Sequence, residues 1–61
     1  MTQIKNPRLK IDILLNLKDT NYYRLIGAGC NVTIVADLGE TVIIKVNDLY
    51  ENVEVYKSIL K

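Results

Sequence analysis

Apolar and polar residues alternate with a period of two in the first third of this chain, and this alternation constrains the fold most strongly. Residues 8–18 read RLKIDILLNLK and carry an apolar residue at every second position: Leu9, Ile11, Ile13, Leu15 and Leu17. A helix would scatter these residues around its circumference, whereas a β-strand places them on one face. The pattern therefore predicts a strand over roughly 8–18. Asn6 and Pro7 leave a helix open as an alternative, because asparagine caps helices and proline suits their first turn.

Three further segments also favour β-structure. Residues 22–27 begin YYRLI and are rich in strand-forming side chains. The β-branched runs at 31–37 and 41–46 flank DLGE, where Gly39 can adopt a positive φ, so together they predict a β-hairpin. We expect about four antiparallel strands, over roughly 8–18, 22–27, 31–37 and 41–46.

The last segment changes its period. Asp48 and Glu51 have the spacing of a capping box. A helix here would align four apolar residues on one stripe: Leu49, Val53, Tyr56 and Leu60. The sequence thus predicts a C-terminal helix over roughly 48–60 and an α+β fold that is mostly β. The alternation of Val53 and Val55 favours a strand instead, and the corresponding alternative fold is a small five-stranded β-barrel.

The short length limits how the chain can be stabilised. Residues 1–61 are expected to form a single small domain, and a domain of about this size buries only ~60% of the surface of its unfolded chain. Small domains usually need a disulfide, a metal or a partner subunit. Cys30 is the only cysteine, so no disulfide can form within one chain. An efficient aliphatic core or association with a partner must supply the stability.

The residues that catalysis requires are missing or poorly placed. The chain has no histidine, so no imidazole can act as a base for Cys30, and we interpret this cysteine as an apolar filler at the end of a strand. Gly27 and Gly29 begin a dinucleotide-binding fingerprint, but Val32 stands where a third small residue is needed. The expected protein is not an enzyme, and it has no catalytic, cofactor-binding or metal-binding residues.

The charge balance and hydropathy pattern set further expectations. Eight basic and seven acidic side chains give a net charge of +1, which predicts no strong field for attracting nucleic acid or anionic membranes. No apolar run reaches the length of about 18 residues that crosses a membrane. The first residues also lack the apolar core of a signal peptide. We therefore expect a cytoplasmic protein without membrane association.

Some apolar residues occupy positions where a strand with one wet face should be polar. Val35 and Ile43 lie on the second face of the predicted hairpin, and Leu14 and Leu25 extend this second apolar surface. With Tyr23, we select Leu14, Val35 and Ile43 as candidate interface residues, because contiguous exposed apolar area marks interaction sites. The leading hypothesis is a non-enzymatic protein-binding module, homodimeric, that acts as a regulator or inhibitor in a microbe, phage or plasmid.

A second hypothesis assigns the chain to small β proteins that bind nucleic acid. Aromatic side chains that stack on bases, interleaved with cations that bind phosphate, are typical of single-strand binding. The candidate residues for this function, as a single-strand binder or transcriptional regulator, are Arg8, Lys10, Tyr22, Tyr23 and Arg24.

Overall fold

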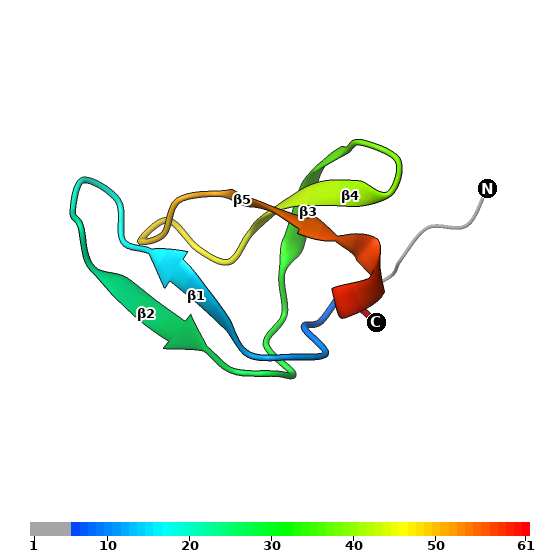
Figure 1. The fold of residues 1–61 in the computed structure, drawn as a ribbon, viewed down its shortest axis with the longest axis horizontal. Helices are drawn as coiled ribbons and strands as arrows, with labels where there is room; N and C mark the ends of the chain where they lie inside the picture. The colour runs from blue at the N-terminus through cyan, green and yellow to red at the C-terminus, as the bar shows by residue number, and fades with distance from the viewer. Residues whose placement is uncertain (1–5) are drawn as a thin grey trace.

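The computed structural model describes residues 6–61 and shows five antiparallel strands in two sheets (Figure 1). The elements are β1 Ile13–Asn16, β2 Tyr23–Ile26, β3 Thr33–Asp37, β4 Thr41–Lys45, β5 Val53–Tyr56 and one turn of 3-10 helix, η1 Lys57–Ile59. β1 and β2 form the β1–β2 hairpin, and the β3–β5 sheet has the strand order β3-β4-β5. The predicted mostly-β, antiparallel architecture is confirmed. The described strands do not close into the barrel of the alternative prediction.

The alternating segment 8–18 is extended, but only its second half is a regular strand. β1 occupies Ile13–Asn16, with isolated bridges on either side of it. The chain bends between these parts, so Ile11 is 51% exposed while Leu9 and Leu15 are buried. The alternative helix does not form. Asn6 has φ 50, which is not the extended conformation of an N-cap residue.

Side-chain hydrogen bonds close the β1–β2 hairpin at its turn. The Asn16 Nδ2 group donates to the carbonyl oxygens of Thr20 and Tyr22, each at 3.1 Å. Asp19 takes φ 63 in this turn, a conformation that aspartate tolerates better than most residues. The register that results places Leu14 opposite Leu25.

The predicted hairpin between the two β-branched runs is confirmed as β3 and β4. Its turn is closed by the Gly39 N–H, which donates to Asp37 Oδ1 at 2.9 Å, and Gly39 has φ 105. The register shifts between Ile34 and Ala36, so Val35 is the extra residue of a β-bulge. This bulge could not be read from simple alternation.

The prediction of a C-terminal helix over 48–60 is wrong. Asn47 Oδ1 accepts a hydrogen bond from the Leu49 N–H at 2.8 Å and begins a turn instead of a helix. The chain then enters β5, and only the single 3-10 turn η1 follows it. Leu49 and Tyr56, two members of the expected apolar stripe, are 63% and 64% exposed.

The physical reason is the pairing that β4 offers to this segment. Val53 and Val55 lie opposite Ile44 and Val42, so the β-branched valines join the inner face of the sheet. A helix of this length has little stability of its own. Tertiary strand pairing therefore outweighs the local helix signal, and the alternating Val53 and Val55 correctly indicated a strand.

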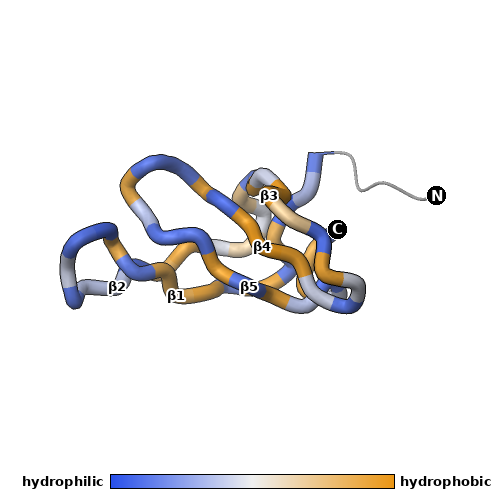
Figure 2. The backbone as a smooth tube through the Cα atoms, turned by 90° about the horizontal axis from the view of Figure 1, so that it is seen from above, coloured by the Kyte–Doolittle hydropathy of each residue, from blue (hydrophilic) through white to orange (hydrophobic). Residues whose placement is uncertain are grey.

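The core lies between the inner faces of the β1–β2 hairpin and the β3–β5 sheet. Its buried residues come from both parts and from their connections: Leu9, Leu15, Ile26, Val32, Val42, Ile44, Tyr50 and Leu60. Figure 2 shows the apolar colouring along β1 and β4, and the hydrophilic loop at the end of the hairpin. The two ends of the described chain meet at this core, where Arg8 and Lys61 exchange two backbone hydrogen bonds of 3.0 Å.

Candidate interaction surface

The side of the β1–β2 hairpin that faces away from the core is apolar and exposed. We call Leu14, Tyr23 and Leu25 the hairpin outer face. Leu14 and Leu25 lie directly opposite each other, and Tyr23 shares their face because it precedes Leu25 by two residues. Their exposed fractions are 62%, 64% and 61%. On the other side of the same strands, Leu15 and Ile26 are buried in the core.

Strand geometry explains why this surface forms. β1 reads ILLN and β2 reads YRLI, so each strand has apolar residues at consecutive positions. Successive side chains of a strand point to opposite faces. A run of this kind must expose an apolar side chain whenever only one face is covered, and here the core covers only the inner face.

The structure brings together two of the four predicted interface residues. Leu14 and Tyr23 lie on the hairpin outer face, where Leu25 joins them. Val35 and Ile43 belong to the β3–β5 sheet instead, where Val35 is 53% exposed at the bulge and Ile43 is half-buried. Because both sheets turn their inner faces to one core, their outer faces point away from it separately, and the four residues do not form one surface.

The strand β2 has one paired edge and one open edge. The Leu17 N–H donates to the Tyr22 carbonyl at 2.9 Å, and hydrogen-bonded and non-hydrogen-bonded pairs alternate along an antiparallel ladder. The backbone groups of Arg24 and Ile26 therefore face β1, whereas those of Tyr23 and Leu25 face away from it. Figure 1 and the order of strands place no described segment along that outer edge.

The predicted nucleic-acid residues fall into two separate groups. Arg8 and Lys10 lie in the segment that pairs with the C-terminal residues, and Lys10 N–H donates to the Ile59 carbonyl at 2.7 Å. The Arg8 guanidinium is already engaged, since its Nε donates to Asn31 Oδ1 at 3.1 Å. The second group is Tyr22–Arg24 on the β1–β2 hairpin, where Tyr22 is 75% exposed. The structure does not assemble all five residues on one element.

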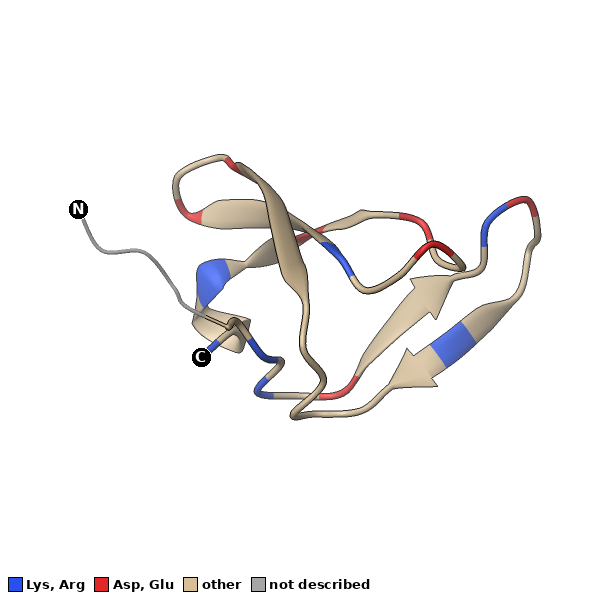
Figure 3. Ribbon diagram, turned by 180° about the vertical axis from the view of Figure 1, so that it is seen from behind, with Lys and Arg blue, Asp and Glu red and all other residues tan. Residues whose placement is uncertain are grey.

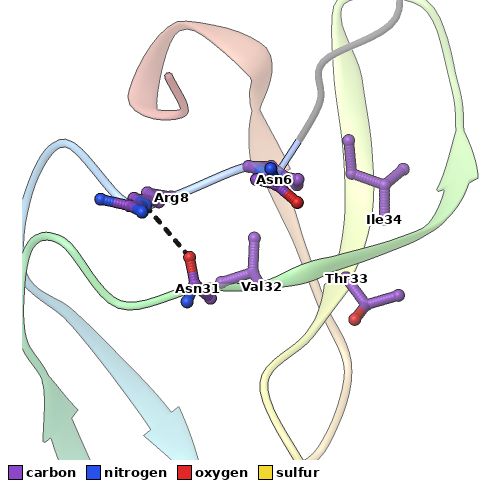
Figure 4. A pocket seen from close by; sticks show the side chains of 7 residues that line it. Asn6, Arg8, Asn31, Val32, Thr33 and Ile34 are labelled. Atoms are coloured by element: carbon purple, nitrogen blue, oxygen red, sulfur yellow. Dashed lines mark hydrogen bonds between the residues drawn. The ribbon is translucent and has the colours of Figure 1, made fainter.

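A pocket of about 550 Å³ lies beside the Arg8–Asn31 hydrogen bond (Figure 4). Its lining residues come from the start of the described chain and from the region where β3 begins: Asn6, Pro7, Arg8, Asn31, Val32, Thr33 and Ile34. The lining contains one charged side chain and no carboxylate or thiol. Its polar groups are the Arg8 guanidinium, the side-chain amides of Asn6 and Asn31, and the Thr33 hydroxyl.

Two ion pairs join charged side chains in and around the β3–β5 sheet. Lys57 Nζ lies 2.9 Å from Asp37 Oδ1, and Lys45 Nζ lies 2.7 Å from Asp48 Oδ1. The Gly39 N–H, and then Lys57, hold the pKa of Asp37 below its ordinary value. The hydrogen bond from Lys45 likewise lowers the pKa of Asp48. These exposed carboxylates stay ionised at neutral pH and act as acceptors in surface contacts.

Other chemical sites are sparse in residues 6–61. Cys30 is half-buried and packs against the core, as expected for an apolar filler. Gly29 takes φ 90 in the turn between the hairpin and β3, so the glycine-containing stretch is an element of chain geometry. No group of three or more histidine, cysteine, aspartate or glutamate side chains in this part of the chain could hold a metal ion. Nor is any helix there long and apolar enough to cross a membrane.

Comparison with protein-family models, with curated proteins and with solved structures finds no match to this chain.

Proposed function

We propose that this chain is a non-catalytic protein-binding module and that the hairpin outer face is its binding surface. The observation that carries the proposal is the cross-strand pair of Leu14 and Leu25, which remain 62% and 61% exposed on a regular hairpin. Contiguous exposed apolar side chains of this kind mark interaction sites. Tyr23 extends the pair and adds a hydroxyl group at its border, as aromatic residues do at many interfaces.

The leucine pair can supply a useful share of binding energy. Full burial of one leucine side chain contributes roughly 1.5–3 kcal/mol, and about three fifths of that surface is still in water for each residue. Covering both leucines would therefore yield roughly 2–4 kcal/mol. In the free chain this binding free energy is not realised, because both leucines face solvent. The chain is therefore well suited to regulate or inhibit another protein by covering part of that protein's surface.

Affinity capture from a lysate of the source organism tests the proposal. We expect the wild-type chain to retain a specific partner and the double variant Leu14→Thr/Leu25→Thr to lose it, because threonine keeps the strand and removes the apolar surface. The matched control is Leu38→Thr/Leu49→Thr, since these loop leucines are 55% and 63% exposed. Retention of the same partner by the hairpin variant, or its equal loss from the control, would overturn the proposal.

Self-association through this surface also stays a prediction, and light scattering across concentration tests it. A homodimer that uses the hairpin outer face should dissociate in Leu14→Thr/Leu25→Thr and persist in the loop control. A monomeric wild-type chain at all concentrations would leave another protein as the partner of this surface and exclude the homodimer.

A nucleic-acid-binding function has one specific observation in its favour. Tyr22 and Tyr23 are 75% and 64% exposed beside Arg24, so bases could stack on them while the cation meets phosphate. Titration with single-stranded and double-stranded oligonucleotides at increasing salt tests this candidate. Binding must weaken as salt is added, because phosphate contacts release counterions. It must also weaken in Tyr22→Ala, because this variant removes a side chain on which a base would stack. An affinity that is unchanged by added salt and by Tyr22→Ala would contradict a nucleic-acid-binding function.

A further inference from the structure

The open edge of β2 provides hydrogen-bonding groups at the correct spacing for an additional strand. The N–H and C=O groups of Tyr23 and Leu25 point away from β1. Within residues 6–61, no other segment forms a backbone hydrogen bond with these groups. The same alternation is visible on β1, where the carbonyl of Asn16 points away from β2 and accepts from the Glu51 N–H at 2.9 Å. An added antiparallel strand forms its hydrogen bonds with every second residue of the edge strand, and these residues are Tyr23 and Leu25 in β2.

Arg24 lies between these two residues and supplies the charge of this edge. The ion pairs of the described chain join Lys45 to Asp48 and Lys57 to Asp37, so Arg24 forms no ion pair within residues 6–61. Leu15, its cross-strand neighbour, is apolar. Arg24 is the one charged residue in β1 and β2. The basic colouring on one strand of the hairpin can be followed in Figure 3.

We propose that β2 binds an extended segment of a partner protein whose central residue is acidic and whose neighbours on both sides are apolar. The partner strand pairs antiparallel with β2, its acidic residue lies opposite Arg24, and its apolar residues lie opposite Tyr23 and Leu25. This inference rests on the proposed function, because the apolar residues of the partner would extend the hairpin outer face by one strand.

The geometry of the ladder favours this arrangement. Tyr23 and Leu25 would form the hydrogen-bonded pairs with the new strand, so Arg24 and the acidic residue would form a non-hydrogen-bonded pair. Side chains approach most closely in such pairs, with Cα atoms ~4.5 Å apart. The arginine and the carboxylate are therefore in position for an ion pair on one face, while apolar contacts form on the other.

The same arginine disfavours pairing of β2 with a second copy of itself. Pairing along the whole strand would place Arg24 opposite Arg24, and like charges directly opposite each other are destabilising. Two antiparallel copies of β2 are related by a two-fold axis, and the register changes with the residue at which this axis lies. With the axis at Tyr23, Leu25 lies opposite Asn21. With the axis at Leu25, Tyr23 lies opposite Gly27. Asn21 and Gly27 both lie outside β2, so each shifted register loses strand pairing.

A nuclear magnetic resonance titration of the full chain tests the proposal directly. The probe is the end-blocked peptide Thr-Val-Glu-Val-Thr, and the matched control carries lysine in place of glutamate. We expect amide shifts centred on Tyr23 and Leu25, with binding of the glutamate peptide about threefold to tenfold tighter than the control. This preference should shrink as salt is added. Equal binding of both peptides, or shifts absent from β2, would overturn the proposal.

Two variants test the backbone and the charge separately. Leu25→Pro removes an N–H that points outward and keeps the hydrogen bonds to β1, so the chain should fold and bind the glutamate peptide at least tenfold more weakly. If Leu25→Pro disturbs the amide signals of the β3–β5 sheet, Tyr23→Pro is used as the proline variant instead, since Tyr23 is the first residue of the strand. Arg24→Glu should reverse the preference toward the lysine peptide. Wild-type binding by the folded proline variant, or an unchanged preference in Arg24→Glu, contradicts the inference.

The variant Leu14→Thr separates this inference from the proposed function. Leu14 lies on β1, away from the β2 edge, so the peptide preference should be unchanged in this variant while partner capture weakens. Capture that depends on Leu14 together with no peptide preference would overturn the edge inference alone. Capture that is indifferent to Leu14 and Leu25 would overturn the hairpin outer face as the binding surface.

Discussion

The β1–β2 hairpin and the β3–β5 sheet contribute to one core but differ in how their outer faces are covered. On the outer face of the sheet, Thr41 Oγ1 donates to Glu54 Oε2 at 2.7 Å, and Ile43 is half-buried at the centre. On the outer face of the hairpin, Leu14 and Leu25 face solvent. β4 has a partner on each side, whereas β2 has a partner on one side only.

This difference suggests a division of roles between the two regions. The central strand of the sheet is paired on both sides, and on its outer face Thr41 and Glu54 bond to one another while Tyr56 stays exposed. The hairpin leaves both an apolar face and a strand edge unused. A free edge of this kind is a liability that proteins usually protect, and here Arg24 gives it charge selectivity.

The largest expected effect compares two adjacent leucines in β1. Leu15→Ala should lower the free energy of unfolding by about 2–5 kcal/mol, because the side chain is only 1% exposed and its removal leaves a cavity. Leu14→Ala, one residue earlier on the outer face, should cost less than about 0.5 kcal/mol. Urea unfolding followed by circular dichroism measures both.

Equal losses for the two leucine variants would contradict this assignment of faces. Ile44→Ala provides the matching test in the sheet, since Ile44 is also 1% exposed and lies in the same core. A loss similar to that of Leu15→Ala would show that hairpin and sheet unfold as one cooperative unit. A small effect for Leu15→Ala beside a large one for Ile44→Ala would show that the hairpin opens on its own.

Alternation in the sequence predicted those parts of the fold that local geometry determines. Leu14 on the far side of its strand and the turn at Gly39 follow directly from period two and from the conformational freedom of glycine. Val35 shows the limit of the same reasoning. A bulge changes the alternation without a local signal, so the sequence alone could not place Val35 relative to Ile43.

The C-terminal segment shows why long-range pairing escapes a local pattern. Asp48 and Glu51 match a capping box, yet Val53 and Val55 reach β4 and join the sheet. The open edge of β2 was equally hidden, because it depends on the order of strands in space. Leu25 was recognised as apolar on the second face, but its position directly opposite Leu14 required the register.

The second prediction concerns the connections rather than the strands. Gly39→Ala should cost about 1–2 kcal/mol, because φ 105 is unfavourable for a residue with a side chain although the space around it is open. Gly27→Ala is the matched control. Its added methyl group would meet only Asp12 Oδ1 at 4.0 Å, so the expected change stays within about 0.5 kcal/mol. Thermal unfolding measures both, and similar losses in the two variants would contradict a special conformational requirement at Gly39.

A third, smaller effect is expected at the hairpin turn. Asn16→Ala removes the Nδ2 donor that serves the carbonyls of Thr20 and Tyr22, and should cost about 1 kcal/mol. Asn16→Asp, which retains the size and loses the donor, should cost a similar amount. If amide exchange of the β1–β2 hairpin is unchanged in both variants, its turn does not depend on these bonds.

The smallest effect is a pH dependence located in the turn of the sheet. The pKa of Asp37 is held below its ordinary value of 3.8, chiefly by the Gly39 N–H and secondly by Lys57. A lowered pKa in the folded chain means that the ionised carboxylate stabilises the fold above pH 3.8 and that this contribution is lost as the pH falls below that value. Asp37→Asn should therefore flatten the acid side of the stability curve, measured by urea unfolding from neutral pH downward.

The variant Lys57→Gln separates the two causes of this pKa shift. Because the backbone hydrogen bond is the largest single cause and stays in place, Lys57→Gln should retain part of the acid dependence that Asp37→Asn removes. Added salt should reproduce the effect of Lys57→Gln, since it screens the exposed ion pair and leaves the Gly39 hydrogen bond in place. If Lys57→Gln flattens the curve as fully as Asp37→Asn, the ion pair rather than the turn geometry controls this carboxylate. The turn of the sheet would then depend on charge, as we propose for the free edge of the hairpin.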